Sequence, residues 1–183
     1  DSSTSDLSYA NRSHTYASGG IYTITITAEI LKGFQFNNAA DRLKLTEIVA
    51  WGAMNITNGY RAFKNCSNLN ITATDAPTIS TTSLYEMFDN CDAITTPDLS
   101  GWDVSGVTLM QNTFSYCALF NGNISNWVHS GVTRIMRIVR SCPQFNQDLS
   151  GWDVSGVTLW EEAFYGCGSF NGSVAGWVPQ GNM

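Results

Sequence analysis

Charged residues are scarce in this sequence, and basic residues are the scarcest. Only 13% of the 183 residues are charged, and nine Lys and Arg against fifteen Asp and Glu give a formal net charge of -6. Phosphate recognition needs a dense basic surface, so this composition argues against a nucleic-acid partner. No apolar run reaches the ~18–20 residues that a membrane-spanning helix needs, so we expect no transmembrane segment.

Motifs of catalysis and of cofactor binding are also lacking. The two histidines, His14 and His129, are far apart in the sequence, and no Ser-His-Asp or Cys-His arrangement can be argued from them. The five cysteines contain no C-x-x-C pair, so a zinc site has no ligand spacing to support it. We therefore expect no cofactor, no metal ion and no enzymatic activity.

The sequence does contain a repeat. Residues 98–109, DLSGWDVSGVTL, return letter for letter at residues 148–159, and a degenerate copy lies between them at residues 123–134. The five cysteines follow each other at steps of 25 or 26 residues: Cys66, Cys91, Cys117, Cys142 and Cys167. A period in this range indicates repeats that stack on one another.

Each repeat shows two apolar patterns. Within residues 107–117, Val, Met, Phe and Cys are spaced by three, four and three residues, which predicts one face of a helix. Within residues 99–107, Leu-x-x-Trp-x-Val-x-x-Val predicts a short strand. Strands stack ~4.8 Å apart whereas helices need ~8–10 Å, so such a stack should curve with its strands inside.

These patterns resemble known repeat families. Leu-x-x-Trp-x-Val-x-x-Val is similar to the strand signature of leucine-rich repeats, with Trp in the second leucine position. Phe-x-x-Cys-x-x-Leu/Phe resembles the BspA-like leucine-rich repeats of bacterial surface proteins. FNQDLSGWDVSGVT and AFYGCGSFNG look more closely like the DUF285 family, or mycoplasma-type lipoprotein repeats, and the lead-in segment HTYASGGIYTITI fits the same family. The resemblance implies a secreted or surface-anchored interaction module, with no known chemistry to transfer.

Together, pattern and resemblance predict an α/β fold. We expect a right-handed leucine-rich-repeat-like solenoid of about five 25-residue coils over residues 60–183. A small β-rich N-terminal cap, residues 1–59, should precede it, with a strand over residues 21–27, where apolar and polar residues alternate. The chain begins and ends abruptly, so we expect it to be a piece of a longer protein whose signal and anchor lie outside it.

Like residues should form columns in such a stack. The cysteines then become buried free thiols rather than a disulfide framework, because their count is odd and all occupy one position of the repeat. The row Trp102, Trp127, Trp152 and Trp177 is assigned to the core rather than to an exposed stripe for sugars. His129 replaces a valine of the other copies, which favours a partly buried, hydrogen-bonded histidine over a catalytic base.

The strand face carries small polar residues and is the candidate binding surface for a protein or glycan partner on a cell or matrix surface. Its candidate residues are Asp103, Ser105, Val128, Ser130, Asp153 and Ser155. Asp103 and Asp153, two repeats apart, would also be the carboxylate pair of a glycan-active enzyme, but solvated or turn-capping carboxylates are favoured.

Arg134, Arg137 and Arg140 line one flank of the third repeat. A solvated face is the default interpretation, and an anionic partner or surface polymer docking on this repeat is the alternative. For the chain as a whole we expect a non-enzymatic extracellular binding or adhesion module of a bacterial surface or secreted protein. A purely structural repeat spacer is the alternative, and a glycan-active enzyme is a remote one.

Overall fold

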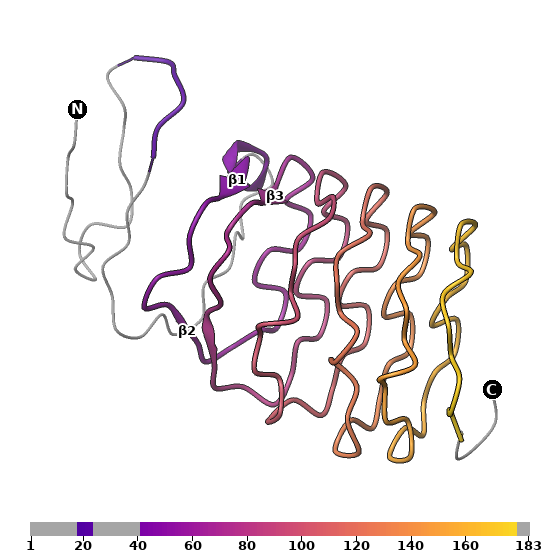
Figure 1. Ribbon diagram of the computed structural model, residues 1–183. Coiled ribbons are helices and arrows are strands. Elements are labelled where there is room, and N and C mark those ends of the chain that lie inside the picture. The colour runs from indigo at the N-terminus through magenta and orange to yellow at the C-terminus, as the bar shows by residue number, and fades with distance from the viewer. Residues whose placement is uncertain (1–17, 24–40, 179–183) are drawn as a thin grey trace.

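The structure, a computed structural model, describes residues 18–23 and 41–178. Its regular secondary structure consists of one 3-10 turn and four strands of two residues each. β1 pairs in parallel with β3, and β2 pairs in parallel with β4. Figure 1 shows most of the chain running in successive layers that lie side by side. The elements are η1 (Arg42–Lys44), β1 (Glu47–Ile48), β2 (Asn55–Ile56), β3 (Asn70–Ile71) and β4 (Thr78–Ile79).

The predicted α/β leucine-rich-repeat-like solenoid is wrong. No α-helix occurs in the described residues, and the four short strands form two separate two-stranded sheets. Of the cap predicted for residues 1–59, only residues 18–23 and 41–59 are described. The strand expected over residues 21–27 is absent from residues 21–23, and the remainder of it lies outside the described residues.

Consecutive tight turns occupy the segments expected to be helical. In the repeat of Cys91, the N–H of Met87 donates to the carbonyl oxygen of Leu84 at 3.1 Å, and the N–H of Cys91 donates to that of Phe88 at 3.2 Å. Glu86 lies in the first of these turns with a φ of 54°, a left-handed conformation that an α-helix does not contain. Each turn brings an apolar side chain back to the same side after three or four residues. That spacing imitates the period of a helix, which is why the sequence pattern predicted one.

Left-handed backbone recurs at the same two positions of every repeat. Both positions lie in the turn segment, five residues and one residue before each cysteine. The first position holds Arg61, Glu86, Asn112, Arg137 and Glu162, and the second holds Asn65, Asn90, Tyr116, Ser141 and Gly166.

Backbone hydrogen bonds between layers take the place of helical bonds. The N–H of Phe88 donates to the carbonyl oxygen of Thr113 at 2.9 Å, one layer further on. The N–H of Phe114 donates to Ile138 at 2.9 Å in the same way. We call this part of each repeat, equivalent to residues 84–94, the turn side. The part equivalent to residues 98–107 is the tryptophan side.

Both sides of a layer have nearly the same spacing. On the turn side, the rings of Phe88 and Phe114 stack with centroids 5.4 Å apart, and on the tryptophan side those of Trp102 and Trp127 lie 5.7 Å apart. The expected curvature depended on helices 8–10 Å apart on one side. Without helices, that reason for curvature disappears.

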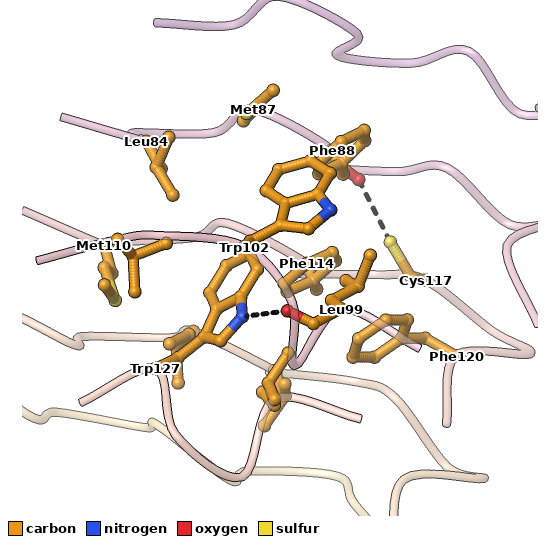
Figure 2. Packing of buried hydrophobic residues seen from close by; sticks show 14 of the residues in the cluster. Leu84, Met87, Phe88, Leu99, Trp102, Met110, Phe114, Cys117, Phe120 and Trp127 are labelled. Carbon is orange, nitrogen blue, oxygen red and sulfur yellow. Dashed lines mark hydrogen bonds between the residues drawn. The ribbon is translucent and has the colours of Figure 1, made fainter. Parts of the chain in front are cut away.

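The core is built from columns of like side chains, as the period predicted. Figure 2 shows Phe88 above Phe114 and Trp102 beside Trp127 in one cluster. The indole N–H of Trp127 donates to the carbonyl oxygen of Leu99 at 3.0 Å in the preceding repeat. Trp102, Trp127 and Trp152 are buried and Trp177 is half-buried, so the assignment of this row to the core is confirmed.

The cysteines form a second column, of free thiols. Cys117 Sγ lies 3.0 Å from the carbonyl oxygen of Phe88 in the preceding repeat, and Cys142 Sγ lies 2.9 Å from that of Phe114. All five cysteines are free; four are buried and Cys167 is half-buried. Burial raises the pKa of Cys66 to about 12, because an ionised sulfur would lose its hydration. The column therefore fills space and ties layers together.

Candidate functional site

The two aspartates predicted for the binding face lie on the surface and cap their own turns. Asp103 Oδ1 accepts a hydrogen bond from the N–H of Ser105 at 3.1 Å, and Asp153 Oδ1 accepts one from Ser155 at 3.0 Å. Hydrogen bonding to the side chain of the same serine, and then to its backbone N–H, lowers the pKa of both carboxyls. Both groups are therefore ionised at neutral pH, and their position is fixed by the local chain.

Such a pair is poorly suited to glycoside hydrolysis. A glycosidase needs one carboxyl that keeps its proton near neutral pH, and its environment must raise the pKa of that group. Hydrogen bonds lower the pKa of Asp103 and of Asp153 instead. The turn-capping interpretation accounts for both residues.

The middle copy of the repeat departs from this pattern. Val128 takes the place of the aspartate and is buried, and its carbonyl oxygen accepts a hydrogen bond from the N–H of Asp153 at 2.9 Å. Ser130 and Ser155 are exposed. Five of the six predicted face residues thus lie at the surface, whereas Val128 belongs to the core.

His129 is half-buried and hydrogen-bonded through both ring nitrogens, as its position in the repeat predicted. Nε2 lies 3.1 Å from the carbonyl oxygen of Val104, and Nδ1 accepts a hydrogen bond from the N–H of Gly131 at 3.1 Å. Because Nδ1 accepts, Nε2 is the ring nitrogen that donates to Val104. The ring links two layers and has no free nitrogen for base catalysis.

Two of the three predicted arginines pair with one glutamate of the next layer. Arg137 Nε lies 2.6 Å from Glu162 Oε2, and an Arg140 amino nitrogen lies 3.4 Å from the same oxygen. The Arg140 guanidinium also lies over the rings of Tyr116 and Tyr165, with centroids 5.3 and 5.6 Å away. Arg134 is exposed, but two of the three charges are already engaged within the fold.

A groove that the sequence did not reveal lies on the tryptophan side. Its volume is about 510 Å³, and its walls are residues 70–76 of one repeat and residues 95–98 and 100–102 of the next. A second hollow of about 370 Å³ continues from it past Trp102 to Asp103, Asn126 and His129. The two hollows share Ser100, Gly101 and Trp102, so they form one extended surface depression.

The groove lies where backbone pairing between successive repeats is interrupted. β3 and β4 pair backward with β1 and β2 rather than forward with the next repeat. Across residues 71–81 and 96–107, no backbone hydrogen bond joins the two described walls. One repeat later the ladder is restored, since the N–H of Asn123 donates to Pro97 at 2.9 Å and that of Leu99 to Asn123 at 3.1 Å. The sequence signal was the 26-residue step between Cys91 and Cys117, with Pro97 inside it.

Two carboxylates hold the walls of the groove. Asp75 Oδ1 accepts a hydrogen bond from the N–H of Trp51 at 2.9 Å, and its Oδ2 accepts one from Gly52 at 2.6 Å. Asp98 Oδ1 accepts the N–H and hydroxyl of Ser100, at 3.1 and 2.7 Å. These hydrogen bonds lower the pKa of both carboxyls. Neither residue was singled out from the sequence as part of a binding site.

The part of the chain that the structure describes contains no cluster of three or more His, Cys, Asp or Glu side chains suited to a metal ion. In the same residues no helix has the length and apolar character needed to cross a lipid bilayer. The groove and its flanking turns offer hydroxyl, amide and carboxylate groups, and neither hollow is lined by Lys or Arg. This lining suits recognition of hydrogen-bonding groups that carry no negative charge.

A family model matches residues 32–93 and 82–182 and is described as a Mycoplasma protein of unknown function, DUF285. No curated protein and no solved structure matches the chain. The two matched segments together cover well over half of the sequence and confirm the resemblance seen in its repeats. The chain therefore belongs to the DUF285 family.

Proposed function

We propose that this chain is a non-enzymatic binding or adhesion module on the outside of a bacterial cell, where it engages a protein or glycan partner. The observation that supports this function best is the pair of Asp-x-Ser turns around Asp103 and Asp153. They stand at equivalent positions of two identical segments, are exposed, and lie on a rigid ladder of layers. A face prepared in this way loses little conformational entropy on binding.

The lowered pKa values support binding over catalysis. Both carboxylates are ionised acceptors whose first hydrogen bonds are already made within the chain. The backbone N–H of each turn bonds Oδ1 alone, and a carboxylate has further lone pairs that can accept from a partner. The family resemblance supports the extracellular setting, because similar repeats occur in bacterial surface proteins.

The test is binding of the purified chain to arrays of extracellular matrix proteins and of oligosaccharides. The double variant Asp103→Asn/Asp153→Asn keeps the turn acceptors while removing both charges. A matched control, Asp92→Asn/Glu161→Gln, removes two charges outside the tryptophan side. We expect a partner whose binding is weakened by the first variant and unchanged by the second.

Absence of any partner on both arrays would favour the purely structural spacer instead. Equal loss of binding in both double variants would show that net charge, rather than this face, attracts the partner. Turnover of a glycan that disappears in Asp153→Asn would contradict the non-enzymatic part of the proposal.

A further inference from the structure

The groove between repeats gives two identical sequences different surroundings. Gly101 and Gly151 occupy the same position of the twelve-residue segment that occurs twice. A Cβ atom on Gly151 would lie 2.9 Å from the carbonyl oxygen of Ser125, whereas a Cβ on Gly101 would meet nothing within 4 Å. The open space beside Gly101 therefore arises from the neighbouring repeat and not from the local sequence.

The tryptophans of the repeat also differ at the groove from their equivalents elsewhere. The indole N–H groups of Trp127, Trp152 and Trp177 each donate to a carbonyl oxygen of the preceding repeat, at 2.8 to 3.0 Å. Trp102 lines both hollows and is the member of this row whose N–H makes no such bond within the described part of the chain. The indole nitrogen of Trp102 is not among the buried side-chain nitrogens that lack a partner, so this donor is open to the hollows and can reach a ligand there.

The polar groups of the lining define the chemistry of the ligand. Asp98 uses one carboxylate oxygen within the fold and leaves the other for a donor from outside. The hydroxyls of Thr74 and Thr96 have no partner among the described residues, and both line the larger hollow. Ionised carboxylates without a basic residue repel anions, so phosphate, sulfate and uronic acid groups are disfavoured.

We infer that this groove is a binding site for a neutral oligosaccharide, which lies along the two hollows with a hydroxyl oxygen accepting from the Trp102 indole N–H. Sugar hydroxyls in turn donate to the free oxygen of Asp98 and exchange hydrogen bonds with Thr74 and Thr96. The two hollows, joined at Ser100, Gly101 and Trp102, provide neighbouring subsites for a linear chain of sugars. This inference rests on the proposed binding function and narrows it to one ligand class.

The experiment is calorimetric titration of the full chain with chitotetraose, maltotetraose and mannotetraose, beside a sulfated heparin tetrasaccharide. Gly101→Leu fills the groove, and Gly106→Leu is the matched control because it also faces open space but lines neither hollow. We expect at least one neutral tetrasaccharide to bind, and Gly101→Leu to weaken it by about tenfold or more while Gly106→Leu leaves it unchanged.

Trp102→Phe is a second variant that removes the N–H donor but keeps an aromatic ring, and we expect it to weaken the same sugar. Unfolding curves of all three variants check that the fold persists. No binding of a neutral tetrasaccharide, preference for the sulfated one, or equal binding by wild type and Gly101→Leu would each overturn the inference. A matrix protein bound through Asp103 and Asp153, with no sugar bound, would overturn this inference and leave the proposed function standing.

Discussion

Gly156 and Gly106 occupy the same position of two identical segments, but only Gly156 is pressed against a neighbouring layer. A Cβ on Gly156 would lie 2.0 Å from the carbonyl oxygen of Ser130, and a Cβ on Gly106 would meet nothing within 4 Å. The layers around Gly156 are therefore too close to admit a methyl group, whereas there is room for one beside Gly106.

This contrast predicts opposite effects of the same substitution. Gly156→Ala should destabilise the fold by about 1–3 kcal/mol, because backbone must move to admit the methyl group. Gly106→Ala should leave stability unchanged or raise it by ~0.4–1 kcal/mol, because it restricts only the unfolded chain. Urea unfolding of both variants measures the difference, and equal midpoints would contradict the layer spacing described above.

The thiol column predicts a graded reactivity. Four buried cysteines should resist alkylation in the native protein, and half-buried Cys167 should react first. In denaturant all five should be modified, which mass spectrometry detects as five added groups. Fewer than five would reveal disulfides and contradict the column of free thiols.

Stability should fall at alkaline pH because the thiols are buried. The pKa of Cys66 is raised to about 12 in the native state, while an unfolded thiol titrates near ~8.5. Between these values the unfolded chain has lost a proton that the native chain keeps, so the free energy of unfolding decreases as pH rises, by at most ~1.4 kcal/mol per pH unit for this group. Below pH ~8.5 its contribution is fully present. Cys66→Ala should make the alkaline decline measurably shallower in urea unfolding at pH 8 to 10, and an unchanged slope would contradict this cause.

The hydrogen bonds of Asp75 predict that the free energy of unfolding also decreases at acidic pH. Hydrogen bonds from Trp51 and Gly52 lower its pKa, so it stabilises the native state above the unfolded value of ~3.9 and loses that effect as pH falls through the native value. Asp75→Ala should cost about 1 kcal/mol at pH 7, a modest figure because the group is exposed. Asp75→Asn, which keeps an acceptor, should recover part of that loss. Unfolding at pH 7 and pH 3 tests this, since wild type and Asp75→Ala should converge at the lower pH.

The ion pairs between layers predict that Glu86 contributes more to stability than Glu162 does. Glu86 is nearly buried; its carboxylate pairs with Arg61 at 2.6 Å and with Lys64. Glu86→Gln should destabilise by about 1–3 kcal/mol, because Lys64 then keeps only Asp89 as its partner. Glu162→Gln, at an exposed pair, should have a smaller effect that vanishes in high salt. Chemical unfolding at low and high salt separates the two, and a larger effect at Glu162 would contradict this ranking.

The sequence predicted the columns of stacked Phe, Trp and Cys side chains, but it did not predict the tight-turn conformation of the backbone. Period and residue type place Phe88 on Phe114 and Trp102 beside Trp127 without knowledge of secondary structure, because stacking needs only a constant step. The helix prediction was wrong because consecutive tight turns repeat an apolar side chain every three or four residues, as a helix does, while Arg137 and Glu162 have a positive φ. Asn112 at the first left-handed position, and Asn65, Asn90 and Gly166 at the second, are of residue types that favour this conformation and so indicated turns.

The candidate site was foreseen in part. The Asp-x-Ser turns around Asp103 and Asp153 lie on the surface, as the repeat pattern indicated. The groove, in contrast, lies where β3 and β4 pair with β1 and β2 and not with the following repeat. This strand pairing involves residues of different repeats, so a short sequence motif does not predict it. A local motif likewise does not show that Glu162 pairs with Arg137 and Arg140 of the adjacent layer.

The ladder of backbone bonds also determines how the molecule yields to a pulling force. Each layer holds chiefly to its neighbours, so tension on the two ends should peel layers off in sequence rather than rupture the whole at once. Each released repeat of 25 residues should lengthen the tether by roughly 80 Å, its extended contour less the thickness of one layer. The weakest joint should be the boundary beside the groove, where no backbone hydrogen bond joins residues 71–81 to residues 96–107, and an optical trap would record its rupture as the first step.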